Sequence, residues 1–381
     1  MTGRICAFQI SNGLGAGNIG DDLMAWAFWD RLPPNVVLEV GILPESARQR
    51  EPYPPRHRYR PVDWQGNESA AAPDMPGLLV GDTPVTDAEG LHWPMQFLAP
   101  RLLHFHRRGQ PVDAVGVGVD RMLQREGRRL FDECFLPIRS WTVRSAQSRE
   151  ALRALDVPAS RIRVGADWSW LYRRRADHRE SARATWRRLG VDPDRPLIAV
   201  NVVNMQWRDR VSAKRAVAAA LDFACARLDV QVGFFCNECR PGEFYDRAAS
   251  QEVAGLMKSP AAIVPNEYYS IDEALALLGC ATVTLGQRYH VVIESVLAGC
   301  VPIAIPRGEK MRDLVSELPI PVAGTIEEVN TESIVAAIRQ GLEQRAEILP
   351  RLAAARAGLA QRALDNLWFL RRLAPYGAQE W

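Results

Sequence analysis

The sequence predicts an α/β protein with two doubly wound, Rossmann-like domains that face a cleft, followed by a long C-terminal helix. Short β-branched apolar runs alternate with segments of helical spacing, which is typical of parallel sheets covered by helices on both faces. The alternation occurs twice, in two halves of similar size separated by a polar, arginine-rich stretch. The 381 residues are enough for two domains of ordinary length.

In the first half, strands and helices are expected to follow one another from the N-terminus onward. One helix begins near Asp21 and another covers residues 145–155. The expected strands are Arg4–Ile10, Val36–Ile42, Leu78–Val80, Ala114–Val119, Trp141–Val143 and Ile162–Gly165. We assign these elements to an N-terminal α/β domain of residues 1–175.

The alternating pattern breaks between Tyr172 and Arg195. The sequence there, YRRRADHRESARATWRRLGVDPDR, is polar and becomes turn-like near its end. Runs of charge usually mark exposed faces, so a solvated surface helix followed by a loop is expected. We place a linker at residues 176–194.

The second half repeats the pattern in a C-terminal α/β domain of residues 195–350. The expected strands are Leu197–Val203, Val230–Phe235, Ala262–Pro265, Ala281–Leu285 and Val301–Ile305, and the expected helices are Ala216–Arg227, Ile271–Leu278 and Val291–Leu297. Residues 351–381 follow as a C-terminal helix packed across the domains, because Arg351–Leu373 is rich in alanine and leucine with little turn chemistry.

Composition excludes several classes of protein. Lys and Arg number 47 and Asp and Glu 45, so the net charge of +2 gives no electrostatic reason for a nucleic-acid partner. No secretory signal and no run of about 18 uncharged apolar residues is present, so we predict a cytoplasmic chain without a membrane span. Cys236 and Cys239 form a lone CxxC without further ligands at related spacing, and no metal site is expected.

A glycine-rich loop follows the first predicted strand and contains Gly13, Gly15, Gly17, Asn18 and Gly20 before two aspartates. Glycines let backbone amides approach a ligand closely, and a helix N-terminus favours anions. Asp21 or Asp22 could cap the helix or hold a substrate hydroxyl, but a tight strand–helix turn explains the same pattern.

Two later loops carry cations at the ends of predicted strands. Arg144 follows Trp141–Val143, where its planar guanidinium suits a carboxylate or phosphate; a structural salt bridge is the alternative. Gly286, Arg288 and His290 lie in a turn that opens a helix, and Lys310 follows the next strand. An arginine and an imidazole at a helix N-terminus make an anion site with an acid/base beside it.

Together these segments resemble the polysaccharide pyruvyl transferase family. The resemblance rests on five blocks: GAGNIGDD (residues 15–22), VGVGVD (115–120), VRSAQS (143–148), IRVGAD (162–167) and GQRYH through AGCVPIAIPRGEK (286–310). They occur in the family's order and cover most of the chain.

The resemblance implies a fold like that of GT-B glycosyltransferases and transfer of a pyruvyl group from phosphoenolpyruvate to a saccharide, giving a pyruvate ketal in cell-surface polysaccharide synthesis. It implies donor binding and catalysis by Arg144, Arg288, His290 and Lys310, with the N-terminal domain on the acceptor side. No cofactor is implied, because phosphoenolpyruvate is itself a substrate. The acceptor is a saccharide or a lipid-linked saccharide, which would bring the chain near a membrane without a span.

From the residues themselves, His290 is the candidate acid/base, because imidazole side chains titrate near neutrality. Asp21 could orient or deprotonate an acceptor hydroxyl, and Gly286 would shape the pocket of the anionic substrate.

Two other functions stay open. A nucleotide-sugar-dependent glycosyltransferase of the same architecture would bind a nucleotide diphosphate. A non-catalytic saccharide- or anion-binding relative is favoured by the lack of a glycine run after Leu78–Val80 and disfavoured by the retained cations.

Overall fold

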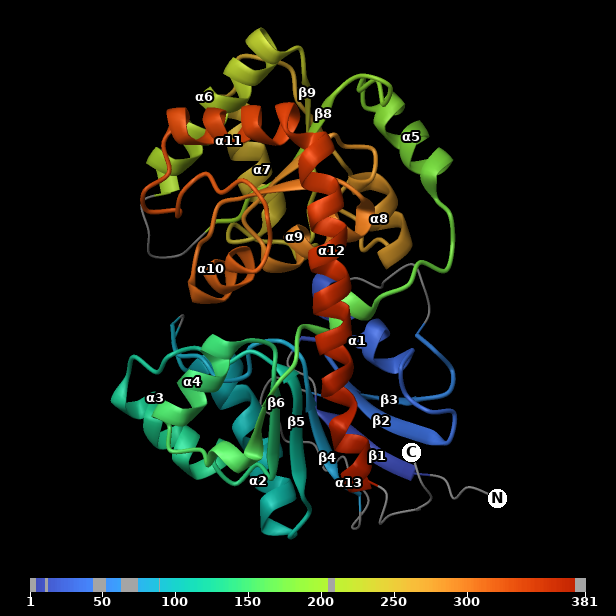
Figure 1. Cartoon of the computed structure of the whole chain (residues 1–381), viewed down its shortest axis with the longest axis vertical. Helices are drawn as coiled ribbons and strands as arrows, with labels where there is room; N and C mark the ends of the chain where they lie inside the picture. Colours follow the sequence, from blue (N-terminus) through green and yellow to red (C-terminus); the bar gives the residue numbers. More distant parts are fainter. Residues whose placement is uncertain are drawn as a thin grey trace.

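The computed structural model describes residues 5–10, 13–43, 53–62, 75–88, 90–204 and 210–373, and it confirms the predicted fold class (Figure 1). One lobe contains a seven-stranded sheet and the other a five-stranded sheet. The long helix α12 (Arg345–Ala363) runs along both lobes on one side. The two lobes are called the N-terminal and C-terminal domains below.

The N-terminal sheet has the strand order β3-β2-β1-β4-β5-β6-β7, and all neighbours are parallel. Its strands are β1 (Ile5–Ile10), β2 (Val36–Ile42), β3 (Arg58–Pro61), β4 (Gly77–Val80), β5 (Val112–Val117), β6 (Ser140–Val143) and β7 (Ile162–Val164). Its helical segments are α1 (Ile19–Trp29), η1 (His92–Gln96), α2 (Phe97–Arg107), α3 (Arg125–Leu130), η2 (Phe131–Phe135), α4 (Ala146–Ala154), η3 (Ala159–Arg161) and η4 (Trp168–Leu171). The order reverses between β1 and β4, and such a reversal creates a crevice at the carboxyl ends of those strands.

The C-terminal sheet has the order β10-β9-β8-β11-β12, again with parallel neighbours. Its strands are β8 (Leu197–Asn201), β9 (Gln231–Phe234), β10 (Ala262–Ile263), β11 (Val283–Gly286) and β12 (Val301–Ala304). Its helices are α5 (Arg179–Arg188), α6 (Arg210–Leu228), α7 (Asp246–Leu256), α8 (Ile271–Leu278), α9 (Tyr289–Ala298), α10 (Glu309–Ser316) and α11 (Thr331–Glu343). This sheet has its own reversal, between β8 and β11.

The interval 176–194 contains helix α5, which packs on the C-terminal domain. Trp186 of α5 is fully buried, and its indole nitrogen donates to the carbonyl of Leu277 at 3.1 Å. Gly233 in β9 makes room for this ring, because a Cβ there would lie 2.3 Å from the indole. One tryptophan thus fixes an otherwise charged helix to the sheet.

The C-terminal helix begins six residues earlier than Arg351 and ends as the shorter segments η5 (Leu364–Phe369) and α13 (Leu370–Leu373). Arg362, near the end of α12, contacts both domains. Its guanidinium pairs with Glu317 at 2.6 Å, and its Nε donates to the Gly165 carbonyl of the N-terminal domain at 3.3 Å. Asn366, which is buried, donates to Ala166 O at 2.7 Å.

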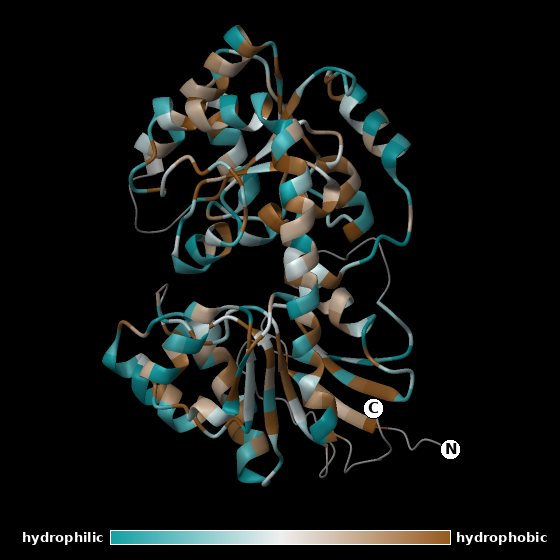
Figure 2. Ribbon diagram, viewed as in Figure 1, coloured by the Kyte–Doolittle hydropathy of each residue, from teal (hydrophilic) through white to brown (hydrophobic). Residues whose placement is uncertain are grey.

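Apolar side chains pack against both sheets, and this packing continues across the junction of the domains. Figure 2 shows hydrophobic residues concentrated in the strands, with hydrophilic residues on the outer helices. One cluster of buried side chains includes Phe28, Val200 and Phe369, from the N-terminal domain, the C-terminal domain and the C-terminal helix. In the part of the chain that the structure describes, no helix is long and apolar enough to cross a membrane.

Strand β3 and helix α2 were not expected from the sequence. β3 lies at the edge of the sheet and carries Arg58 and Arg60 on largely exposed positions, so it lacks the apolar alternation of a buried strand. Helix α2 contains Pro100 in its interior, and because proline disfavours helix interiors the sequence there does not indicate a helix.

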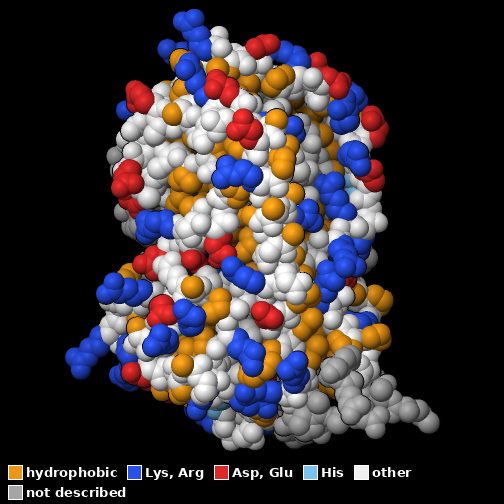
Figure 3. All heavy atoms as spheres, viewed as in Figure 1, with side chains coloured by type: hydrophobic (Ala, Val, Ile, Leu, Met, Phe, Trp, Pro, Cys, Tyr) orange, Lys and Arg blue, Asp and Glu red, His pale blue; other side chains and the backbone are white. Residues whose placement is uncertain are grey.

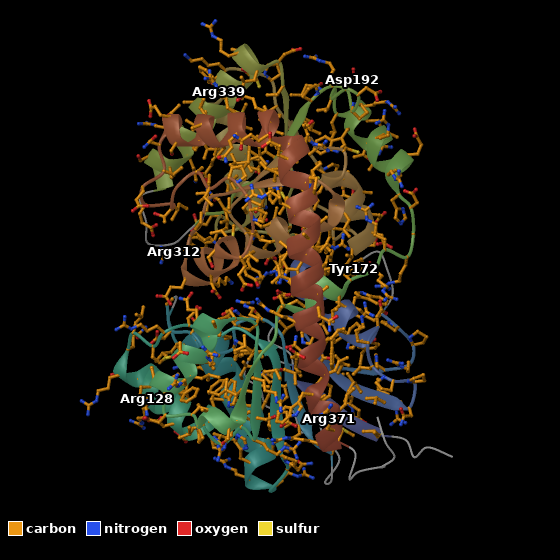
Figure 4. The ribbon with its side chains drawn as sticks, viewed as in Figure 1. Arg128, Tyr172, Asp192, Arg312, Arg339 and Arg371 are labelled. Carbon is orange, nitrogen blue, oxygen red and sulfur yellow. The ribbon has the colours of Figure 1, made fainter. Side chains whose placement is uncertain are left out.

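The anchoring of the C-terminal segment can be tested at Phe369, which is fully buried with its ring centroid 6.0 Å from that of Phe28 in α1. We expect Phe369→Ala to lower the free energy of unfolding by about 3–5 kcal/mol, because it removes a large side chain from a packed core. Urea denaturation gives this difference. The control is Arg371→Ala, at an exposed position two residues on (Figure 4), which should change it by less than about 0.5 kcal/mol. Equal effects of the two substitutions would show that the segment does not anchor the fold.

Candidate active site

Ionisable side chains follow seven strands of the two sheets at their carboxyl ends. They are Asp21 after β1, Asp82 after β4, Asp120 after β5, Arg144 after β6, Asp167 after β7, Arg288 and His290 after β11, and Lys310 after β12. Because each sheet is parallel, its carboxyl ends share one edge. The contacts described below bring the two edges together between the domains.

The glycine-rich loop after β1 is fixed against the C-terminal domain by backbone hydrogen bonds. Cys239 N donates to Gly17 O at 2.7 Å, and Ile19 N donates to Asn237 O at 3.0 Å. Gly17 has φ +88°, in the left-handed region that favours glycine. The Asn18 side chain caps α1 by accepting from Gly20 N at 3.0 Å. The first turn of α1 therefore lies at the domain interface.

His290 is the second residue of α9 and packs directly on this turn. A Cβ at Gly20 would lie 2.4 Å from His290 Nδ1, so only glycine fits there. His290 is 8% exposed, and its Nε2 lies 3.8 Å from Asp167 Oδ2, too far for a hydrogen bond. Among the described residues this buried nitrogen has no hydrogen-bond partner. Nε2 is thus a buried polar atom that the described residues leave unsatisfied.

Arg144 is buried beside His290 and is held from three sides. Its guanidinium donates to Thr83 Oγ1 at 2.8 Å, pairs with Asp167 Oδ2 at 3.4 Å and stacks over the Tyr289 ring at 4.3 Å. Gly118 leaves space for it, since a Cβ there would lie 2.5 Å from Nη2. The guanidinium is consequently held in one orientation at the cleft.

Asp167 is the carboxylate between Arg144 and His290. Burial alone would favour its neutral form, but His290, Arg144 and the Ser169 N–H stabilise the charge and lower its pKa to about 2. Ser169 N donates to Oδ1 at 2.9 Å. A permanently charged Asp167 therefore orients both the guanidinium and the imidazole.

Lys310, in the first turn of α10, is a further cation within electrostatic range of Arg144. Burial lowers its pKa, and Arg307 adds to the effect, while Asp82 and Asp120 act against it. Its ammonium forms no hydrogen bond or close ion pair with any described residue. We call Arg144, Asp167, His290 and Lys310 the Arg144 cluster.

Arg288 belongs to a different set of contacts. Its Nε donates to Asp246 Oδ1 at 2.6 Å. Asp246 is fully buried and also accepts from Asn201 Nδ2 at 2.8 Å and from the backbone nitrogen of Asn237 at 3.0 Å. Arg288 is thus compensated by a carboxylate of its own domain, unlike Lys310. The sequence had assigned both cations to one anion.

Glu294 of α9 is fully buried, and the charges of Arg288 and Asp246 both act on it. Burial raises its pKa to about 8, and the charge of Asp246 adds to the rise while Arg288 opposes it. With its amide nitrogen turned toward the carboxyl group, Asn237 donates to Glu294 at 3.0 Å. Glu294 is therefore largely protonated at neutral pH.

The adjacent aspartates of α1 have different environments. Asp22 is fully buried and accepts from the hydroxyl of Tyr268 of the C-terminal domain and from Tyr53 at 3.5 Å. Asp21 has no hydrogen-bond partner among the described residues. Burial raises its pKa well above the usual range, and Asp82, Glu238 and Asp22 raise it further. Asp22 therefore joins the domains, whereas the surroundings of Asp21 raise its pKa and favour its neutral form.

Gly286 is the last residue of β11, and its carbonyl accepts from Ile305 N at 3.0 Å. A Cβ there would meet Val291 at an ordinary 3.4 Å, so no close approach demands glycine. Sequence reasoning missed Asp167, Thr83 and Asp246. The first two follow strands, as Arg144 does, and the same rule would have selected them.

Metal binding finds no support in the described ranges, where no three His, Cys, Asp or Glu side chains are arranged around a common point. Cys236 and Cys239 are both buried, free thiols. Burial raises the pKa of Cys236 to about 12, and Asp246 adds to the rise. A protonated thiol is a poor metal ligand.

Comparison with known proteins identifies the fold but does not assign the chain to a family. No family model and no curated protein matches the sequence. Among solved structures, MnaA from S. aureus in a structure with UDP has a TM-score of 0.62 at 10% identity, covering 100% of both chains. A glycosyltransferase from Rickettsia africae has a TM-score of 0.61 at 11% identity, covering 97% of this chain and 98% of that one. HepE from Anabaena with UDP and glucose has 0.60 at 11%, covering 97% and 99%.

These similarities confirm the GT-B-like architecture predicted from the sequence. UDP-N-acetylglucosamine 2-epimerases have the same fold, and one from Neisseria meningitidis bound to UDP-GlcNAc has a TM-score of 0.57 at 10% identity, covering 96% of this chain and 99% of that one. At such identities the likeness concerns the fold alone. The resemblance to pyruvyl transferases stays a prediction.

The role of Asp167 can be tested with Asp167→Asn, which leaves the guanidinium of Arg144 buried without its carboxylate. We expect the free energy of unfolding at pH 7 to fall by about 3 kcal/mol. A carboxylate whose pKa is lowered on folding stabilises above its unfolded pKa of about 3.9. The difference from wild type should therefore shrink as the pH falls from there toward 2. Urea titrations at pH 7 and pH 3 measure it, with exposed Asp365→Asn as control. Equal stability of variant and wild type at pH 7 would contradict this role.

The raised pKa of Glu294 predicts a pH dependence of stability opposite to that expected for Asp167. Between its unfolded pKa of about 4.3 and its folded value of about 8, the folded state holds one proton more than the unfolded state, so this group makes stability fall as pH rises. Glu294→Gln cannot ionise, and it should gain on the order of 3 kcal/mol relative to wild type between pH 5 and pH 9. Thermal unfolding across this range measures the gain, and exposed Glu343→Gln should show none. Parallel curves for wild type and Glu294→Gln would rule out a buried, neutral Glu294.

Proposed function

We propose that this chain is a pyruvyltransferase that moves a pyruvyl group from phosphoenolpyruvate to a saccharide, forming a ketal. The observation that carries the proposal is the Arg144 cluster. It combines a buried imidazole nitrogen without a hydrogen-bond partner among the described residues, an oriented guanidinium and an ammonium without a close ion pair in that part of the chain, contributed by both domains. A small substrate with a carboxylate and a phosphate suits these groups.

The charges in the cleft favour a compact anion. Arg144 offers a planar guanidinium that suits a carboxylate, and Lys310 offers a point charge that suits a phosphate. Asp167 compensates Arg144 only in part, at 3.4 Å. Asp82 and Asp120 lie within electrostatic range of Lys310 and would repel an anion outside the cationic positions. Binding would therefore depend on how the substrate is oriented.

The reaction needs a proton at the methylene carbon of phosphoenolpyruvate, which makes C2 electrophilic. One saccharide hydroxyl attacks C2, the phosphate group leaves with its bridging oxygen, and a second hydroxyl closes the ketal. Two hydroxyl protons are released, one balancing the proton added to carbon and one leaving with phosphate. Asp21 suits the acid because burial and the neighbouring carboxylates raise its pKa, and His290 Nε2 suits the base because it has no hydrogen-bond partner among the described residues.

A nucleotide-sugar-dependent glycosyltransferase or epimerase is the second candidate, and the structural comparisons support it more directly. HepE has been solved with UDP and glucose, and MnaA with UDP. In this chain a nucleotide diphosphate would meet the loops after β9 and β11, where Arg240 and Arg288 lie. Both arginines are already paired with carboxylates, at 2.6 Å with Asp246 and at 2.8 Å with Glu238. For this reason we place it second.

The two candidates differ in the product released. We expect phosphate release from phosphoenolpyruvate that depends on a saccharide acceptor, and no UDP release from UDP-glucose or UDP-N-acetylglucosamine under the same conditions. A coupled phosphate assay and a UDP assay with one panel of acceptors measure both. UDP release or epimerised UDP-sugar without phosphate release would favour the second candidate. Binding of saccharides without turnover of either substrate would indicate a non-catalytic relative.

The matched variants in this assay are His290→Asn and His178→Asn. His290→Asn should lower kcat by at least about 100-fold, because general acid–base catalysis typically contributes that much. His178 precedes α5 and makes no side-chain cap there, so His178→Asn should leave kcat within about twofold. Wild-type turnover in a folded His290→Asn variant would remove His290 from the mechanism.

A further inference from the structure

A second cavity, separate from the Arg144 cluster, lies beside α12 where the two domains join. It has a volume of about 650 Å³ and opens to solvent. Its wall combines residues of α12, of the segment after η4 and of the end of α9, with Arg31 from the turn after α1. Figure 4 labels Tyr172, one of the lining residues, next to α12. We call this space the junction cavity.

Three arginines from three different segments line the junction cavity: Arg31, Arg173 and Arg356. No aspartate or glutamate is among the lining residues that the structure describes. On the face drawn in Figure 3, Lys and Arg side chains gather beside the junction of the lobes. The cavity therefore concentrates positive charge without carboxylates in its wall.

The guanidinium groups retain free donors. Arg173 and Arg356 form no hydrogen bond or ion pair with any described residue. Arg31 donates from Nη2 to Leu171 O at 2.9 Å, while its buried Nε has no partner. The neighbouring carboxylate, Asp30, lies outside the cavity wall and is 3.8 Å from Arg175 Nε. Most of the donor capacity of the three side chains is thus unused.

Burial and neighbouring positive charge both act on the pKa values of these arginines. Burial lowers the pKa of Arg31, with Arg173 adding to the effect and Asp30 opposing it. Burial likewise lowers the pKa of Arg356, and Arg174 adds to it. Arginine remains charged at any physiological pH. An anion between these groups would relieve both the desolvation and the repulsion.

The rest of the wall is apolar and comes mainly from α12, with Leu349, Leu352, Ala353 and Ala357. The volume lies in the range of small-molecule sites, which combine apolar walls with a few convergent polar groups. A bare inorganic ion would leave most of this space and all of the apolar surface unused. The cavity suits a compact organic molecule that carries a phosphate or diphosphate group.

We propose that the junction cavity is a binding site for a phosphorylated small molecule, whose phosphate is held by Arg31, Arg173 and Arg356. Guanidinium groups bind phosphate oxygens through paired, charge-assisted hydrogen bonds, which matches their free donors here. The organic part rests on the apolar face of α12. The site is independent of the reaction proposed above and shares no residue with the Arg144 cluster.

Isothermal titration calorimetry with inorganic pyrophosphate, at low salt, tests the charged half of the site. Three variants are compared with wild type: Arg173→Gln/Arg356→Gln, Arg351→Gln and Lys310→Met. Arg351 is a matched control, exposed on the same helix and outside the cavity wall. Lys310→Met weakens binding at the Arg144 cluster, so binding that keeps the wild-type affinity in this variant comes from elsewhere.

We expect the double variant to weaken pyrophosphate binding at least about tenfold, while Arg351→Gln and Lys310→Met retain it. Arg173→Gln and Arg356→Gln are also measured singly, since neither removes a hydrogen bond of the described structure. Circular dichroism checks the fold of every variant. Loss of binding in Lys310→Met but not in the double variant would assign the ion to the cleft and overturn the proposal. No binding to wild type at millimolar pyrophosphate would also overturn it.

Discussion

The contact between Gly20 and His290 is the constraint on which the cleft depends. Each residue lies in the first turn of a helix, Gly20 in α1 of the N-terminal domain and His290 in α9 of the C-terminal domain. A single methyl group at position 20 would come within 2.4 Å of the imidazole. Two helix N-termini, each with partial positive charge, can therefore meet only because one of them lacks a side chain. This meeting brings His290 to Asp167 and Arg144 of the other domain.

Charge compensation then decides which cations can act on a ligand. Buried charges are tolerated when they are paired, and most of those at the interface are paired: Arg144 with Asp167, Arg288 with Asp246 and Arg240 with Glu238. The pairs of Arg288 and Arg240 are shorter than that of Arg144. Lys310 has only longer-range partners. An anion entering the cleft would gain most from Lys310 and from the part of Arg144 that Asp167 leaves free.

The sequence predicted the two sheets, the long helix and the loops that carry Arg144, His290 and Lys310, because buried parallel strands have a clear apolar pattern and ligands bind where they end. It did not predict β3, because the arginines of this edge strand interrupt the apolar pattern by which a strand is recognised. It also did not predict the anchoring of α5 by Trp186. It also did not reveal that Asp246 neutralises Arg288. Asp246 begins a helix 42 residues away, and no local pattern connects the two.

Asp21 and Asp22 show why such properties lie beyond local sequence. The two carboxyl groups are neighbours on one helix, but successive side chains point about 100° apart, so each meets a different part of the C-terminal domain. Asp22 meets the Tyr268 hydroxyl, while Asp21 meets the field of Glu238 and is left without a hydrogen bond. The burial and the carboxylate that raise the pKa of Asp21 come partly from the other domain. If the domains separated, the contribution of the C-terminal domain to this raised pKa would be lost. The raised pKa of Asp21 is therefore a property of the assembled domains and of neither domain alone.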